Sequence, residues 1–171
     1  MTLIQNLQQK TGLSRSAFYN HFKDKNDLVQ WIYYNYVLCN FQEVRIEENY
    51  YENLIAYYQL VEKYHHFLKS ALKVNEQNCL REYMYAHPFE WEQKYHEKWY
   101  QENQVEDSSE EELRFFTKYH ALASVGMTIE WIMEDMPIPP EIMAKRITFL
   151  KQVGFSQILN DKEQNAIHPY D

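Results

Sequence analysis

The chain has 171 residues, of which 45% are hydrophobic, 3 are glycine and 5 are proline. The scarcity of the two main turn formers argues against an all-β protein and predicts long helices. No run of about eighteen apolar residues occurs, and the first residues lack the features of a signal peptide, so we expect a soluble cytoplasmic protein without a membrane partner. Cys39 and Cys79 have no CxxC spacing, which fits a reducing compartment, although a disulfide between them stays open.

The net charge of −8 is unevenly distributed. Residues 1–37 carry a net charge of +2, and the remainder of the chain carries −10. A mildly basic head on an acidic body would turn the head toward the phosphates of a nucleic acid. The alternative is that two charges of either sign are noise in the composition.

The first elements of the chain have the pattern of a helix-turn-helix. Apolar residues spaced as in an amphipathic helix predict a short helix over 3–10, and Gly12 permits a sharp turn after it. Ser14 is a good N-cap for a second short helix over 14–22. Asp24 can cap a third helix that we expect to run to about Arg45.

The remaining sequence predicts further helices and no strands. We expect helices over 50–64 and 65–73, another from 75 past Pro88 toward 99, and an acidic loop over 101–112. A capping-box spacing at Ser109 and Glu112 predicts a long helix that ends near Asp135. The last helix is expected to begin at the prolines 137–140 and to stop at Gly154, as a residue that follows a helix C-terminus.

Residues 11–28 form a specific motif. It contains Thr-Gly-Leu-Ser, the aromatic pair Phe18-Tyr19, the pair His21-Phe22, and lysine three residues before Leu28. This string resembles the recognition segment of TetR/AcrR-family transcription regulators. The resemblance implies an all-α fold with a helix-turn-helix head over 1–45 and a C-terminal dimerisation and effector-binding bundle over 46–171. It also implies a sequence-specific, homodimeric DNA-binding regulator whose partner is a double-stranded DNA operator.

The polar residues of this segment are the candidate DNA-binding residues. A recognition helix places its N-terminal side chains near base edges in the major groove, which suits Arg15, Ser16 and Asn20. The other candidates suit phosphate contacts, as the resemblance implies for the Tyr, His and Lys positions: Ser14, Tyr19, His21, Lys23 and Lys25. The alternative for each is a helix cap or a solvated face.

The resemblance also implies a helix before the one that begins at Leu3. The sequence shows none, so we expect the head to be incomplete, because two short helices leave apolar faces exposed. An incomplete head would weaken DNA binding. It favours an alternative function, a dimeric module that binds a protein coactivator or a small molecule without binding DNA.

Residues 50–158 resemble, less specifically, the C-terminal domain of regulators of dihydroxyacetone kinase operons. The similar stretches are 67–72, 75–83 and 123–132. The resemblance implies that the last two long helices pair with their symmetry mates in a four-helix interface. Candidate interface residues are Phe116, Ala123, Gly126, Met127, Phe149 and Val153. Candidate effector-binding residues are Tyr57, Tyr58, Phe67, Tyr83, His120 and Trp131, although aromatic side chains at helical spacing are more often core residues.

No motif indicates an enzyme. The seven histidines include no HxxxH or HExxH spacing, and the sequence contains no GxGxxG, GxSxG or P-loop. We therefore expect no catalytic residues, no cofactor and no metal site.

Overall fold

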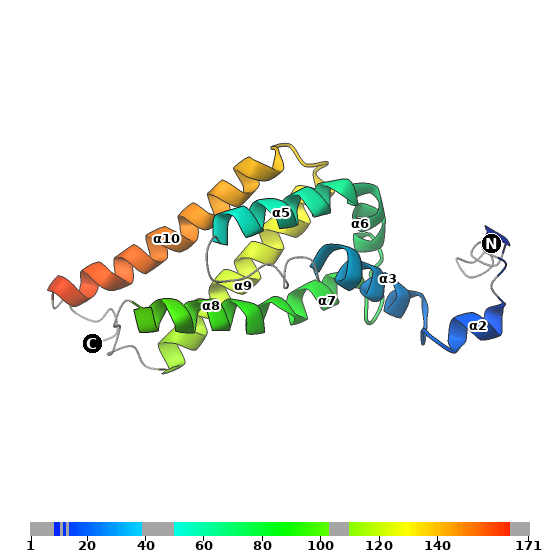
Figure 1. Cartoon of the computed structure of the whole chain (residues 1–171), viewed down its shortest axis with the longest axis horizontal. Helices are drawn as coiled ribbons and strands as arrows, with labels where there is room; N and C mark the ends of the chain where they lie inside the picture. The colour runs from blue at the N-terminus through cyan, green and yellow to red at the C-terminus, as the bar shows by residue number, and fades with distance from the viewer. Residues whose placement is uncertain (1–8, 11, 13, 39–49, 103–109, 165–171) are drawn as a thin grey trace.

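The computed structural model describes residues 9, 10, 12, 14–38, 50–102 and 110–164, and its element labels are those of Figure 1. This part of the chain consists of helices joined by short links and contains no strand, which confirms the predicted all-α class. The elements in chain order are α2 (Arg15–Tyr19), α3 (Lys25–Tyr33), the π-helix η1 (Tyr34–Leu38), α5 (Tyr50–Lys63), α6 (His65–Leu72), α7 (Leu80–Ala86), α8 (Pro88–Glu102), α9 (Glu110–Met133) and α10 (Pro140–Gln164).

Helices α5 to α10 form an elongated body, and α2 lies apart from it at one end of the molecule (Figure 1). Within the body α8 packs along α9 and α10 packs along α5. Fully buried aliphatic side chains from four helices form the core at the centre of the body: Val61, Leu68, Leu80, Ile129 and Ile132. Burial of such side chains is the main stabilising contribution to a bundle of this kind.

The two predicted N-caps of the head are confirmed. The Ser14 hydroxyl accepts a hydrogen bond from the backbone N–H of Ala17, and Asp24 accepts from the N–H groups of Asn26 and Asp27. Each bond satisfies donors that the first turn of a helix leaves without an intrahelical acceptor. Residues 9 and 10 are helical, and the remainder of the helix predicted over 3–10 lies outside the described residues.

The predicted third helix changes register after Tyr33 and continues as a π-helix. The side chain of Asn35 donates from Nδ2 to the carbonyl of Trp31, at 2.8 Å. In a regular α-helix that carbonyl would accept the backbone N–H of residue 35. A side chain that takes this place locally widens the helix, which the hydrophobic pattern alone did not reveal. The predicted end near Arg45 and the proposed domain boundary lie outside the described residues.

The helix predicted from 75 to 99 is two helices. Asn78 has a φ of 58°, so the chain turns there, and its N–H donates to Oε2 of Glu82 inside the first turn of α7. Pro88 then begins α8, because proline lacks an N–H donor and is best tolerated in a first turn.

The predicted stop at Gly154 is wrong, because α10 continues through it to Gln164. A Cβ atom at position 154 would lie 2.9 Å from Cε2 of Phe116 and 3.3 Å from Nε2 of His120. Glycine is therefore present for close packing of α10 against α9 rather than to end the helix.

Candidate functional site

A cavity lies inside the body where the end of α3 and η1 meet α5, α7, α8, α9 and α10. The volume open to the centre of a water molecule is about 80 Å³. Its wall is mainly apolar and aromatic, with a few polar groups: Tyr33, Leu38, Tyr50, Leu54, Tyr57, Tyr58, Met84, His87, Glu92, Ser124, Val125, Thr128 and Ile147. A concave, mainly apolar site with a few converging polar groups is the usual form of a small-molecule site.

The hydroxyls of three wall tyrosines, Tyr33, Tyr57 and Tyr58, are hydrogen bonded to neighbouring hydroxyls. Thr128 Oγ1 donates to the Ser124 carbonyl at 2.7 Å, so the Tyr58 hydroxyl, 3.1 Å away, donates to Thr128. Burial raises the pKa of Tyr58 well above its usual range. The hydroxyls of Tyr33 and Tyr57 lie 3.0 Å apart, and burial raises the pKa of Tyr33 to about 12. These phenols are therefore neutral at physiological pH.

Glu92 is the acidic group of the cavity wall, and it forms a buried ion pair. Its side chain accepts on Oε2 from Lys151 Nζ of α10 at 2.5 Å, and the two residues are 4% and 1% exposed. Lys151 Nζ also lies 4.0 Å from the ring centroid of Tyr50 and 4.8 Å from that of Tyr95. Burial lowers the Lys151 pKa, and the Glu92 carboxylate opposes this change. The aromatic faces and the carboxylate together compensate the ammonium for lost water.

Two histidines adjoin this ion pair. His96 Nδ1 lies 2.8 Å from Thr117 Oγ1, whose hydroxyl donates to the Leu113 carbonyl, so Nδ1 carries the hydrogen. Burial, and then the charge of Lys151, lowers the pKa of His96 to about 2 and that of His120 to about 4. Both rings are therefore neutral at physiological pH.

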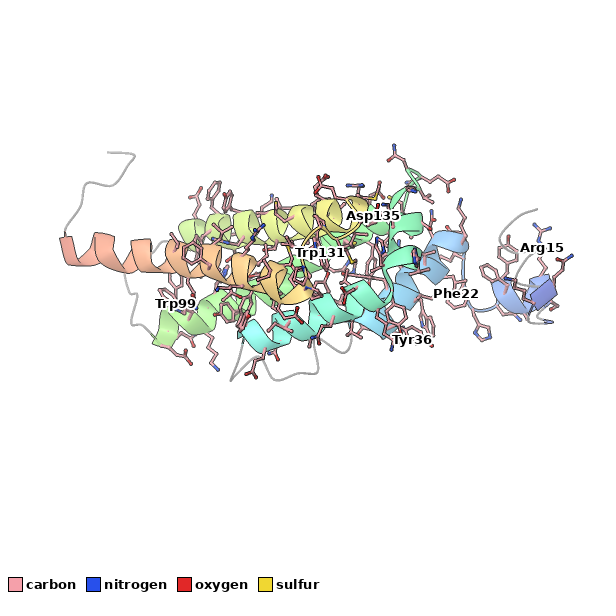
Figure 2. All side chains as sticks on the ribbon, turned by 90° about the horizontal axis from the view of Figure 1, so that it is seen from above. Arg15, Phe22, Tyr36, Trp99, Trp131 and Asp135 are labelled. Carbon is pink, nitrogen blue, oxygen red and sulfur yellow. The ribbon has the colours of Figure 1, made fainter. Side chains whose placement is uncertain are left out.

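The candidate effector residues do not form one site. Tyr57 and Tyr58 line the cavity, whereas the other four lie elsewhere in the body. Trp131 packs on Tyr58 with a centroid distance of 5.4 Å and donates from Nε1 to the Ile138 carbonyl, so it is a core residue, inside the bundle in Figure 2. Tyr83 packs edge-on against Tyr33 and stacks on His87. Both of these residues line the cavity, whereas Tyr83 lies behind them.

Two further candidates are also separate from the cavity. Phe67 on α6 packs against the main core. His120 belongs to the cluster around His96, at a ring distance of 6.0 Å.

The candidate DNA-binding side chains gather at the far end of the molecule. Figure 2 shows Arg15 there, distant from Trp99 at the other end of the body. The side chains of Ser14, Arg15, Ser16, Tyr19, Asn20, His21 and Lys23 are exposed. Phe18 and Phe22 pack on each other at 5.6 Å, and Phe22 packs on Trp31.

Lys25 differs from the other candidate DNA-binding residues. Its ammonium lies 2.8 Å from Oε2 of Glu76 in the link between α6 and α7. A phosphate contact by Lys25 would therefore compete with this ion pair.

The candidate interface residues divide into two groups. Ala123, Met127, Phe149 and Val153 are exposed on α9 and α10. Phe116 faces inward, where its ring lies against His96 and Gly154, and Gly126 faces Tyr85 Oη of α7.

The sequence interpretation did not find Glu92, Lys151, His87, Tyr33 or Leu38. Lys151 follows Ala144 and Ile147 at helical spacing on the buried face of α10, and Glu92 precedes His96 by one turn. A charged residue in an apolar stripe is the signal that could have indicated this pair. Among the residues that the structure describes, no group of three potential ligands could hold a metal ion, and no helix has both the length and the apolar character needed to cross a bilayer.

The family model TetR_C_8, a transcriptional regulator C-terminal region, matches residues 48–152, which is more than half of the chain. The all-helical body and this match define the protein as a transcription regulator. The chain belongs to the TetR family of regulators and carries this type of C-terminal region. No individual curated protein matches it.

Proposed function

We propose that this regulator is a homodimer that binds a double-stranded DNA operator through α2 and is controlled by an effector in the body. The observation that carries the proposal is the exposed polar surface of α2 at the end of a chain whose body has a regulator fold. Helix α2 lies apart from the body (Figure 1), and Ser14 caps it, so its first turn, with Arg15 and Ser16, can approach base edges.

Dimerisation is proposed to use the outer faces of α9 and α10. Both helices expose large apolar side chains, of which Phe115 is 72% and Phe149 60% exposed. Leu122, Met127, Leu150 and Val153 extend the same character. Apolar surface of this extent is typical of an interface, and a two-fold dimer would present two heads to a pseudo-palindrome.

Control is proposed to arise in the cavity, whose wall joins the end of α3 to the body through Tyr33 and Leu38. A small molecule that binds better to one head arrangement than to the other would shift DNA affinity. The similarity of 50–158 to regulators of dihydroxyacetone kinase operons makes such an operon a candidate target, and a protein coactivator a candidate second partner.

The test is a salt titration of binding to the DNA beside the gene. Genuine binding weakens steeply as salt rises, because phosphate contacts release counterions. Lys25→Ala should weaken binding to all sequences alike and reduce the salt slope by about 1, whereas Arg15→Ala should change the sequence preference. The absence of any salt-dependent binding would contradict the DNA-binding function and favour the interaction-module alternative.

A further inference from the structure

The charge on the cavity wall is already balanced inside the protein. The Glu92 carboxylate and the Lys151 ammonium are in contact and almost fully buried, so together they carry no net charge. The adjacent His96 ring adds none, because it is neutral at physiological pH. An ion of either sign that enters the cavity would lose water of hydration. It would also meet one buried charge of its own sign, while the charge of opposite sign is already paired.

The carboxylate nevertheless retains a capacity to accept hydrogen bonds. Lys151 Nζ and, at 3.4 Å, His96 Nε2 both lie against Oε2 of Glu92. Within the described part of the chain, no hydrogen bond reaches Oε1. An ionised carboxylate has about four lone-pair sites over its two oxygens, so Oε1 can accept from a molecule in the cavity.

Three other polar groups of the wall donate their hydrogens within the protein. His87 Nδ1 lies 2.8 Å from the Tyr83 carbonyl, which can only accept, so the hydrogen on Nδ1 is donated within the protein. The donor protons of Tyr58 and Thr128 are used within the wall. A molecule that binds to Oε1 of Glu92 must therefore bring its own donor.

The cavity also limits the size of its occupant. A volume of about 80 Å³ open to the centre of a water molecule holds about six waters, since each needs roughly 10–15 Å³ of such space. That is the room needed for a compound with a single ring and a short polar substituent. Most of the wall is formed by tyrosine rings and aliphatic side chains, which suit an apolar body.

Resting on the proposed effector function, we propose that the cavity binds a small neutral molecule with an apolar body and a hydroxyl that donates to Oε1 of Glu92. The apolar body lies against Tyr33, Tyr57 and Tyr58. The Glu92–Lys151 pair thus acts as a specificity determinant that selects neutral donors against ions.

Three probes of equal size and different charge test this proposal on the full chain: benzyl alcohol, benzylammonium and benzoate. In calorimetric titrations at neutral pH we expect benzyl alcohol to bind at least tenfold more tightly than either ion. Val125→Phe, which fills the cavity from its wall, should abolish this binding while the protein remains folded. Tighter binding of an ion, or no binding of benzyl alcohol, overturns the proposal.

A double variant separates the role of Glu92 from stability. Glu92→Leu with Lys151→Met removes both charges and leaves no buried ion without its partner. We expect benzyl alcohol to bind at least tenfold more weakly to this variant. The control is Lys98→Met with Glu102→Leu, which removes an exposed ion pair from the same helix and should leave binding unchanged. Equal affinity of the double variant and the natural chain would overturn the role of Glu92.

The DNA assay keeps this result distinct from the proposed function. If salt-dependent DNA binding is present and the neutral probe does not bind, the ligand class is wrong and the regulator assignment stands. If the neutral probe binds as expected and no DNA is bound, the cavity inference stands and the DNA-binding proposal fails.

Discussion

The Lys25 ammonium lies 2.8 Å from Oε2 of Glu76, and this ion pair joins the first residue of α3 to the link between α6 and α7. Two hydrogen bonds accompany it: Asn26 Nδ2 donates to the Gln77 carbonyl at 3.1 Å, and Gln30 Nε2 donates to the Asn78 carbonyl at 2.7 Å. Helix α3, which follows α2, is therefore held to the body along one face. A change in the body can reach the head through these contacts.

Glu76→Gln should strengthen DNA binding by up to about fivefold at low salt, because it frees Lys25 and removes a carboxylate beside it; this corresponds to about 1 kcal/mol. The gain should disappear as salt rises. Electrophoretic or anisotropy titrations at several salt concentrations measure it, with Glu102→Gln as the control at an exposed ion pair far from the head. Weaker binding by Glu76→Gln at low salt would show that the pair positions the head instead of restraining Lys25.

The two helical glycines should respond oppositely to alanine. Gly154→Ala should destabilise the protein by about 1–3 kcal/mol, because its Cβ would lie 2.9 Å from Phe116 Cε2. Gly126→Ala should stabilise it by about 1 kcal/mol, since the nearest atom to the new Cβ is Tyr85 Oη at 3.5 Å and alanine is the better helix former. Urea unfolding of the two variants measures both effects. A stabilising Gly154→Ala would contradict the close packing of α10 on Phe116.

Acidification should destabilise the protein through His96 and His120. Their pKa values of about 2 and about 4 lie below the ordinary value of 6.5, so the unfolded chain takes up protons first as pH falls. The contribution of these histidines to the free energy of unfolding is fully present above pH 6.5 and is lost as the pH falls toward 4. The loss is roughly 1.4 kcal/mol per pH unit for each histidine that stays neutral in the folded state.

Variants of single histidines separate this effect from other titrations. Unfolding measured from pH 7 to 4.5 should be less pH-dependent in His96→Asn, whose amide can keep the hydrogen bond to Thr117. His66→Gln changes an exposed histidine and is the control. Parallel pH profiles for His96→Asn and the natural chain would refute the assignment.

Phe149→Glu should weaken the proposed dimer by roughly thirtyfold or more, the equivalent of about 2 kcal/mol for a hot-spot side chain. The stability of the monomer should change little, because Phe149 is 60% exposed in the single chain. Sedimentation at several protein concentrations measures the dissociation constant. Ala56→Glu introduces the same charge on the exposed face of α5 and should leave it unchanged. An unaltered dimer in Phe149→Glu would remove α10 from the interface.

The buried ion pair should behave as a coupled unit. Glu92→Leu alone should destabilise the protein by about 3 kcal/mol or more, because it leaves the Lys151 ammonium buried without its carboxylate. Adding Lys151→Met should recover most of this loss, since two buried apolar side chains of similar volume require neither hydration nor an ion partner. A double-mutant cycle of unfolding free energies measures the coupling. Additive losses would indicate that the two residues act independently.

Much of the architecture was predictable from local signals. The N-caps Ser14 and Asp24, the helices over 50–64 and 65–73 and the all-α class follow from capping and periodicity, which depend on neighbouring residues. The prediction that the last helix stops at Gly154 was wrong because of a contact between residues that are distant in the sequence. Glycine after an amphipathic stretch often ends a helix, and only the ring of Phe116 on another helix explains why α10 continues there.

The sequence by itself determined the class of fold and the motif of the head, because caps, helical spacing and the segment 11–28 are properties of adjacent residues. Only the tertiary structure decided which aromatic side chains surround a cavity and that Glu92 meets Lys151, residues 59 positions apart in the chain. Helical spacing states which residues share a face, but it does not state which faces meet. The charge balance of the cavity wall, on which the proposed ligand class depends, arises from that meeting.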